Sequence, residues 1–501
     1  MHTTALAVFC FFFLIVTMAG FWAARWRRPP SGIASLEEWG LAGRSIGTLI
    51  TWFLIGGDLY TAYTVIAVPA ALYGAGAMGF FALPYAIVAY PYMMVVMPRL
   101  WRVCHRHGYV TLADFVGGRY SFPPLTLAIA VTGILSLMPY IALQLVGMRV
   151  VITALGVDGE WPAAAAFLIL AAYTYSSGLR APAVIAIVKD LMLYIMVIAA
   201  IVILPLKLGG YANIFAVANQ ALSTHTPAST IGLRPGQFLP YTTLAFGSAV
   251  ALMLYPHTAT AVMSAKSANT VRRNAALLPA YSFLLGLIAL LGYVALAAGV
   301  RTKDTSLAVP LLFLQQFPEW FAGFCLSAIA IGALVPAAIM SIAASNLFTR
   351  NLYGLFRRSK MTAEEESRVA KLVSLLVKFG ALIFVLRLPA PYAIEMQLLG
   401  GIWIAQLFPS VVCGVFTRWF HPWALLAGWA AGMASGSAMA LALGLKSSVY
   451  PLHLFGQTYA MYAAVPALLL NLVLAGALTP FCRALAARDR GDSTDAEAYV
   501  G

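Results

Sequence analysis

The sequence predicts an all-α integral membrane protein, and three observations lead to this fold class. Hydrophobic residues make up 62% of the 501 residues, whereas charged residues make up only 10%. A soluble globular chain carries about 25% charged residues. The apolar residues also form long runs without charge, as in membrane-spanning helices of about 20 residues, and they do not alternate as the strands of a membrane barrel do. This composition excludes disordered, fibrous, nucleic-acid-binding and ordinary cytosolic-enzyme proteins.

The charge-free runs predict about thirteen transmembrane helices, because each run is close to the length that crosses the hydrocarbon core. In order along the chain, the predicted spans lie at residues 4–24, 46–73, 79–98, 123–154, 162–178, 182–205, 238–264, 274–299, 320–348, 370–388, 394–416, 422–443 and 458–480.

The first span is a retained helix in this interpretation, not a signal peptide. Ala5 to Ala24 is an uncharged stretch of 20 residues, longer than the apolar region of about 7 to 15 residues in a signal peptide. The basic cluster Arg25, Arg27 and Arg28 follows the stretch, whereas a signal peptide carries its positive charge in front.

Two later spans contain helix breakers. Gly56 and Gly57 adjoin in the second span, and Pro256 interrupts the seventh. A proline removes one helical hydrogen bond and frees a carbonyl group, and a glycine pair lets a helix unwind. Discontinuous helices of this kind form mid-membrane binding sites in secondary transporters.

Basic residues are distributed unevenly between alternate loops. With the N-terminus outside, most arginines and lysines fall in loops predicted to be cytoplasmic. The loops predicted to be outside hold only Lys207, Arg234, Arg301, Lys303 and Lys446. This asymmetry predicts an outside N-terminus and a cytoplasmic C-terminus. It also accounts for the net charge of +14 without a nucleic-acid partner.

No folded soluble module is expected outside the helices. The longest loop lies between Leu206 and Gln237, and the tail at residues 481–501 is charged and contains Gly, Asp and Ser, which predicts a disordered segment. The five cysteines are widely spaced, so they indicate neither disulfides nor a metal cluster. Because the sequence also has no nucleotide-binding or zinc-hydrolase motif, we expect no enzyme activity and no bound cofactor. Any uphill transport must use an ion gradient.

Ionisable side chains within spans are candidate functional groups, because each costs roughly 2.5 to 3.5 kcal/mol at a helix centre. Asp58 follows the glycine pair of the second span, where it either serves an ion or substrate or hydrogen-bonds locally. Lys189 and Asp190 interrupt the sixth span, as a structural pair, a snorkelling lysine or a coupling site. His257 follows Pro256. It is either a hydrogen-bonded core residue or a proton carrier, since imidazole exchanges protons close to neutral pH.

Uncharged polar groups add further candidates. Gln144 lies in the fourth span, with Arg149 five residues on. A glutamine at this depth either donates to a substrate carboxylate or joins neighbouring helices. Glu395 and Gln397 begin the eleventh span, where solvation of Glu395 at the outer surface is one interpretation.

Four segments recur in the order known from one transporter family. They are Leu41-Ala-Gly-Arg-Ser-Ile-Gly, Val110-Thr-Leu-Ala-Asp-Phe-Val-Gly-Gly-Arg-Tyr, Ser177-Gly-Leu-Arg-Ala-Pro with the Lys-Asp pair after it, and Ser341-Ile-Ala-Ala-Ser-Asn-Leu-Phe-Thr-Arg-Asn-Leu-Tyr. The chain resembles the sodium/solute symporter family over nearly its whole length. Gly57-Asp-Leu-Tyr-Thr-Ala-Tyr, Met138-Pro-Tyr-Ile-Ala-Leu-Gln-Leu-Val-Gly and Tyr255-Pro-His resemble its bacterial monocarboxylate permease branch, which takes up lactate, pyruvate and similar short acids.

The resemblance implies a leucine-transporter-type fold with two inverted five-helix repeats and broken helices. The implied parts are an extra N-terminal helix at 1–24, a first repeat at 46–205, a second repeat at 238–416, two further helices at 422–480 and the tail at 481–501. The substrate would lie at mid-membrane between the broken second and seventh spans.

The resemblance and the polarity of the spans together give the candidate site residues. The candidates for substrate binding are Thr61, Thr64, Tyr140, Gln144, His257 and Gln397. The candidates for ion coupling are Gly57, Asp58, Tyr60 and Asp190.

One departure from the family concerns sodium. Family members with a sodium site use carbonyl groups of the broken helix, matching Gly57 and Tyr60 here. They also use a Ser/Thr pair about sixteen residues before the end that matches Asn351-Leu-Tyr. In this chain those positions are Val335 and Pro336, which offer no side-chain oxygen to a hard cation.

The resulting hypothesis is a symporter that imports a small monocarboxylate with a proton, in which Asp58, Asp190 or His257 titrates. Its expected setting is the bacterial inner membrane, with lipid and a small organic acid as partners and no obligatory protein partner. The alternatives are a sodium-coupled symporter of an amino acid such as alanine or proline, or of pantothenate, and a transporter-like membrane sensor that works with a partner.

Overall fold

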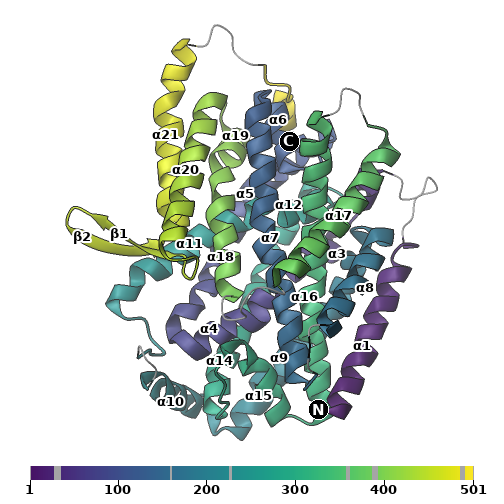
Figure 1. Cartoon of the computed structure of the whole chain (residues 1–501), viewed down its shortest axis with the longest axis vertical. Coiled ribbons are helices and arrows are strands. Elements are labelled where there is room, and N and C mark those ends of the chain that lie inside the picture. Colours follow the sequence, from purple (N-terminus) through teal and green to yellow (C-terminus); the bar gives the residue numbers. More distant parts are fainter. Residues whose placement is uncertain are drawn as a thin grey trace.

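The computed structural model describes residues 2–26, 35–157, 159, 161–224, 228–356, 361–385, 393–485 and 491–499. Within these residues the chain is a bundle of long helices that run side by side (Figure 1). Arg27, Arg28, the end of the predicted span 370–388 and parts of the tail lie outside the described residues.

The first half of the chain contains the helices before and after the predicted interruption of the second span. They are α1 Thr3–Trp22, α2 Leu36–Leu41, α3 Thr48–Leu59, α4 Val68–Ala75, α5 Ala82–His107, α6 Leu112–Tyr120, α7 Pro123–Ala154, α8 Trp161–Ser177, α9 Arg180–Lys207 and α10 Gly210–Ser223.

The second half contains the second broken helix and the C-terminal helices. They are α11 Phe238–Leu254, α12 Pro256–Met263, α13 Ala268–Leu277, α14 Pro279–Ala297, α15 Ala308–Gln316, α16 Glu319–Leu347, α17 Ala363–Val385, α18 Ala393–Ile404, α19 Gly414–Phe416, α20 Pro422–Ala442 and α21 Ala464–Leu485. Two strands, β1 Val449–Leu454 and β2 Gln457–Tyr462, form an antiparallel hairpin.

Each predicted span overlaps a helix or a broken helix of the structure, so the all-α membrane fold is confirmed. Ten helices or helix runs among the described residues are long and apolar enough to cross a bilayer. The remaining overlaps fall on shorter or more polar helices, such as α3, α8 and α17. The number of crossings therefore stays a prediction.

The last predicted span begins too early. Residues 458–462 belong to β2, and the helix starts only at Ala464. The cause is a two-residue turn, because Phe455 and Gly456 both have positive φ, 50° and 77°, as a tight hairpin requires. The apolar residues of this segment therefore pair as strands instead of extending the helix.

The C-terminal segment departs from the predicted disorder. Cys482 to Leu485 continue α21, and residues 491–499 dock on the ends of α5 and α6 at the end of the bundle where α6 lies (Figure 1). Asp492 contacts Arg119 and, at 3.1 Å, Arg418. Composition favoured disorder, but the acidic residues of the tail meet arginines that lie far away in the sequence.

The first broken helix is interrupted just after α3. Tyr60 has φ −88° and ψ 78°, and the chain resumes as a π-helical turn, Tyr63–Ala67, that leads into α4. Gly56 and Gly57 themselves remain helical. A side chain at Gly56 would overlap the ring of Tyr281, so this glycine serves close packing, and the helix is interrupted four residues later, at Tyr60.

The second broken helix is interrupted at Tyr255, whose φ is −59° and ψ 133°, and Pro256 begins α12. The predicted interruption is therefore confirmed. Beyond the breaks, Ile46 and Ala265 form a parallel β-bridge, and the N–H of Lys266 donates to the Ile46 carbonyl at 2.9 Å. This bridge holds the start of α3 beside the end of α12.

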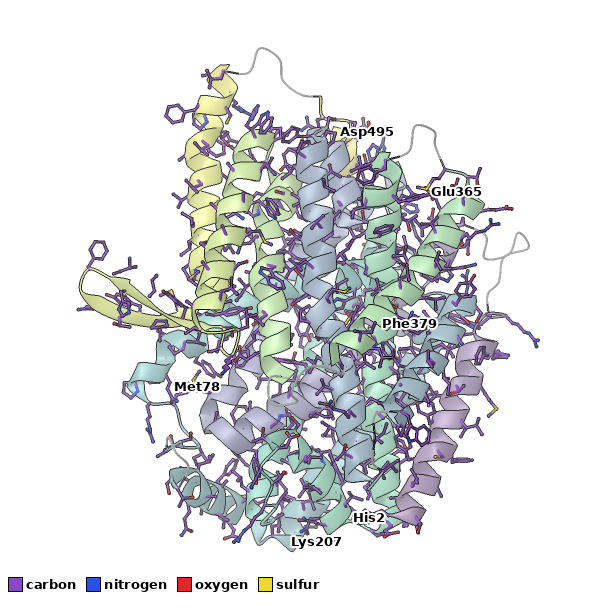
Figure 2. All side chains as sticks on the ribbon, viewed as in Figure 1. His2, Met78, Lys207, Glu365, Phe379 and Asp495 are labelled. Carbon is purple, nitrogen blue, oxygen red and sulfur yellow. The ribbon has the colours of Figure 1, made fainter. Side chains whose placement is uncertain are left out.

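The two ends of the bundle differ in the segments that they hold. The N-terminus lies at the same end as α10 and α15, whereas the C-terminal segment lies beside α6 at the opposite end (Figure 1). In Figure 2, His2 and Lys207 mark the first end, and Glu365 and Asp495 mark the second. This arrangement agrees with the expected alternation of loops along the chain.

Docking of the tail can be tested with a cysteine at Ala498, which is buried. Asp492→Ala removes the carboxylate shared by Arg119 and Arg418, so Ala498→Cys should react several-fold faster with a maleimide. The assay uses detergent-solubilised protein in which the native cysteines are replaced. Glu497→Ala is the control, because its 86% exposed side chain makes only a 3.5 Å contact with Arg106. Equal labelling rates in the two variants would show that Asp492 does not hold the tail.

Candidate functional site

The candidate site lies where the two broken helices face each other. Asp58 is on the last turn of α3, and His257 and Thr258 are on the first turn of α12. The imidazole Nε2 of His257 lies 3.5 Å from the Asp58 carboxylate, and the Thr258 hydroxyl donates to the same oxygen at 3.4 Å. All three side chains are buried. The two breaks therefore bring an acid, an imidazole and a hydroxyl together inside the bundle.

This polar group is incompletely hydrogen-bonded. Asp58 Oδ1, His257 Nδ1 and Gln397 Oε1 are buried and have no partner among the described residues. The contacts of 3.4 Å from Thr258 and 3.5 Å from His257 are also longer than ordinary hydrogen bonds. Because buried polar atoms in folded proteins are nearly always paired, these atoms indicate a place that a polar ligand completes.

Aromatic rings enclose His257. The ring centroid of Tyr140 on α7 lies 5.3 Å from that of His257, and the ring centroid of Tyr255 lies 5.1 Å from it. The hydroxyl of Tyr255 donates to the carbonyl of Gln397 on α18 at 2.9 Å. The rings fix the orientation of the imidazole, and the hydrogen bond ties the second break to α18.

The first turn of α12 adds backbone donors. The first backbone hydrogen bond of this helix runs from the N–H of Ala259 to the carbonyl of Tyr255, at 3.0 Å. The N–H groups of His257 and Thr258 precede it. Free N–H groups at a helix start favour an anion, and here they lie beside the loosely held carboxylate of Asp58.

The first break is held by side chains that sequence reasoning assigned to the substrate. The Thr64 hydroxyl donates to the carbonyl of Leu59. The Gln144 side chain accepts from the N–H of Ala62 at 3.0 Å and donates to the carbonyl of Tyr140 at 3.1 Å.

Thr61 is engaged at the same break. Its hydroxyl oxygen accepts from the N–H of Tyr63 at 3.0 Å. Thr61, Thr64 and Gln144 therefore each hydrogen-bond to backbone groups at the break. Direct substrate contacts by Thr61, Thr64 and Gln144 stay a prediction.

A second polar cluster lies on the other side of the same break. The ammonium group of Lys189 on α9 donates to the carbonyl of Gly57 at 2.5 Å and to that of Tyr60 at 3.1 Å. It also lies 3.1 Å from the carboxylate of Asp190. The second carboxylate oxygen of Asp190 accepts from the hydroxyl of Tyr281 on α14 at 2.8 Å. The Lys189 and Asp190 side chains are both buried.

The face of α16 next to this cluster has no hydroxyl group. A side chain at Gly332 would begin 3.9 Å from the Tyr60 carbonyl. Val335 and Pro336 share the face of Gly332, because residues three and four apart are neighbours on a helix. All three residues are buried. The structure thus supports the inference that the usual sodium hydroxyls have no counterpart here.

Most of the sequence-predicted residues therefore fall into two clusters. Asp58, His257 and Tyr140 lie together, with Gln397 linked to them through Tyr255, whereas Gly57, Tyr60 and Asp190 contact Lys189. The other three, Thr61, Thr64 and Gln144, hold the backbone of the first break.

Three participants were missed by sequence reasoning. Lys189 was weighed as a structural pair with Asp190, a snorkelling lysine or a coupling site, but it was not chosen as a candidate site residue, although a lysine in an apolar helix is itself a functional signal. Tyr255 and Thr258 flank the Pro-His pair in sequence, and that adjacency was the available signal. Among the described residues, no group of three or more His, Cys, Asp or Glu side chains is placed to hold a metal ion.

Comparison with known proteins identifies the family. A sequence model of the Sodium:solute symporter family matches residues 39–436. The "Monocarboxylate transport permease protein" of Rhizobium johnstonii is 52% identical over 475 residues, which cover 94% of this chain and 96% of that protein. The "Uncharacterized symporter YodF" of Bacillus subtilis is 34% identical and covers 86% of this chain, with 87% of its own length matched.

A solved structure gives the fold. The substrate-bound outward-open state of a Na⁺-coupled sialic acid symporter superposes with a TM-score of 0.76 over 95% of this chain and 97% of that chain, at 15% identity. The leucine-transporter-type fold is therefore confirmed. The family match and the 52% identical relative make the chain a multi-pass membrane transporter of symporter type. On the family match and the 52% identical relative, this chain belongs to the sodium:solute symporter family.

Proposed function

We propose that this symporter imports a small monocarboxylate, such as lactate or pyruvate, together with a proton. The observation that supports it most directly is the pair of Asp58 and His257 at the two helix breaks, 3.5 Å apart. Each has a buried polar atom that lacks a partner within the part of the chain that the structure describes. The relative that is 52% identical and named as a monocarboxylate transport permease supports the substrate class.

Charge balance favours a proton as the driving ion. A monocarboxylate brings one negative charge into a buried space that already holds the Asp58 side chain. Two carboxylates close together do not both stay ionised in such a place. A proton shared within the Asp58–His257 pair would compensate the charge of the substrate, so that acid and proton enter together without net charge.

Donors for the substrate carboxylate are available on one side of the pair. The N–H groups of His257 and Thr258 lie at the start of α12, and a helix start attracts anions. The unpaired Nδ1 atom of His257 and the unpaired side-chain oxygen of Gln397 would bind the polar groups of a short acid. Tyr140 and Tyr255, close to the imidazole, would limit its size.

We infer the orientation of the chain in the membrane from the charges of its loops, and its division into two repeats from its family. The end with α6 and the tail is cytoplasmic and the end with α10 and α15 is outside, in a bacterial inner membrane, because the basic loops favour this orientation. The repeats would comprise α3 to α9 and α11 to α19. We expect no enzyme activity, no bound cofactor and no obligatory protein partner.

The direct test is uptake of labelled lactate or pyruvate into proteoliposomes. An imposed proton gradient, acidic outside and without sodium, should drive accumulation, because the proton compensates the substrate charge. A sodium gradient at equal pH should not. Uptake driven by sodium alone would contradict the proton proposal. Competition by unlabelled alanine, proline or pantothenate, without competition by lactate or pyruvate, would instead identify one of the alternative substrates.

The role of Asp58 can be separated from substrate binding. Asp58→Asn mimics a permanently protonated carboxyl group, which can neither take up nor release the transported proton. Proton-driven accumulation should therefore fall by about 10-fold or more, a factor that corresponds to the free energy of one hydrogen bond to a charged group. Exchange of external labelled for internal unlabelled acid should persist. Asp304→Asn is the matched control, because Asp304 only caps a surface turn through the N–H of Ser306 and asparagine caps equally well. Normal accumulation by Asp58→Asn would exclude Asp58 as the proton carrier.

A further inference from the structure

We propose that the ammonium group of Lys189 is a built-in cation that permanently fills the ion site at the first helix break, so that no sodium ion binds there. The inference deepens the proposed function, because it gives the reason why a member of a sodium-coupled family would be driven by protons. It concerns a residue that neither the family match nor the relatives assign.

The first argument is the coordination of the ammonium group. Its nitrogen lies 2.5 Å from the Gly57 carbonyl, 3.1 Å from the Tyr60 carbonyl and 3.1 Å from the Asp190 carboxylate. An ammonium group has three N–H donors, and three oxygens face it. The side chain is fully buried, so these oxygens replace its water.

The second argument is the nature of the oxygens. Two are backbone carbonyls that point out of a helix because the helix ends at Leu59, and the third belongs to a carboxylate. Carbonyl and carboxylate oxygens are the ligands that hard cations select. A free cation could not share the place, because two positive charges a few ångströms apart repel strongly in a buried site.

The third argument is the shape of the surroundings. A side chain on Gly57 would begin 3.1 Å from the Lys189 nitrogen and 2.9 Å from Asp190 Oδ2, so the lysine reaches the carbonyls only because this residue is glycine. On the opposite side, Gly332, Val335 and Pro336 provide no side-chain oxygen. The site therefore accommodates a tethered ammonium group and lacks the hydroxyl ligands that would complete a shell around a free ion.

A simple ion pair does not explain this arrangement. Lys189 and Asp190 adjoin in α9 and form an ion pair at 3.1 Å, but the ammonium group also donates to two carbonyls at the first break, which an ion pair alone does not require. Asp190 is also held by Tyr281, and the Tyr60 hydroxyl donates to the Tyr281 carbonyl at 2.7 Å. The lysine thus lies in a network that joins α3, α9 and α14.

A second buried lysine shows the difference. Lys378 on α17 donates to the Ser374 hydroxyl at 2.8 Å and forms no ion pair with a carboxylate among the described residues. It lies away from any helix break, within the continuous helix Ala363–Val385. Burial alone therefore does not place a lysine on a pair of free carbonyls, and Lys378 provides a matched control.

The test measures thermal unfolding of the purified protein in detergent, in choline chloride, sodium chloride or methylammonium chloride at equal ionic strength. The wild type should unfold at the same temperature in all three salts. Lys189→Ala vacates the site, so sodium or methylammonium should raise its unfolding temperature saturably, by about 2 °C or more. Choline is too large to enter. Lys378→Ala should show no difference between the salts.

Two results would overturn the proposal. One is a saturable stabilisation of the wild type by sodium, and this measurement needs no variant, so it remains decisive if Lys189→Ala does not fold. The other is a folded Lys189→Ala protein that responds to neither sodium nor methylammonium, or responds no more than Lys378→Ala. The unfolding assay contains no substrate, so its result does not depend on which substrate the protein transports. Failure of monocarboxylate uptake would therefore refute the proposed function and leave the role of Lys189 open. Failure of the unfolding test would refute the role of Lys189 and leave the proposed function open.

Discussion

The structure depends on one constraint, namely that backbone groups freed by a broken helix in the middle of a membrane must find partners within the protein. The first break exposes groups between Gly57 and Ala62. Thr64, Gln144 and Lys189 each bond to one or two of them. Thr64 comes from the turn that follows the break itself, Gln144 comes from α7 and Lys189 comes from α9. The break is therefore a junction at which several helices are tied together.

The two sides of this junction differ in how completely their polar atoms are paired. On one side, the Lys189 ammonium donates to the two carbonyls and lies 3.1 Å from Asp190 Oδ1, an oxygen that has this ion-pair contact but no hydrogen-bond partner among the described residues. On the other side, Asp58, His257 and Gln397 each keep an unpaired buried atom. A paired cluster favours a fixed structural ion, and an unpaired cluster favours a ligand that comes and goes. This contrast is the physical basis for assigning the proton and the substrate to the second side.

Chain segments remote from the junction show how local composition and long-range contacts compete. The tail was predicted to be disordered from its charge, yet Asp492 lies between Arg119 and Arg418. Residues 458–462 were predicted to begin the last helix, yet Phe455 and Gly456 turn the chain into a hairpin of which these residues form the second strand. In both cases the deciding partner or conformation is not visible in the hydrophobic pattern on which the spans were assigned.

The sequence alone determined the membrane class, the position of nearly every helix and the break at Pro256, because hydrophobic length and a proline are local properties that each segment expresses by itself. It also identified the second span as interrupted, but the break lies at Tyr60 and not at the glycine pair. It also showed that Val335 and Pro336 cannot supply hydroxyl ligands. Only the tertiary structure decided which polar groups meet. Lys189 reaches carbonyls on a helix about 130 positions earlier in the chain, and His257 meets Asp58 across some 200 residues. Such pairings depend on the direction of side chains in a packed bundle, which no single segment encodes.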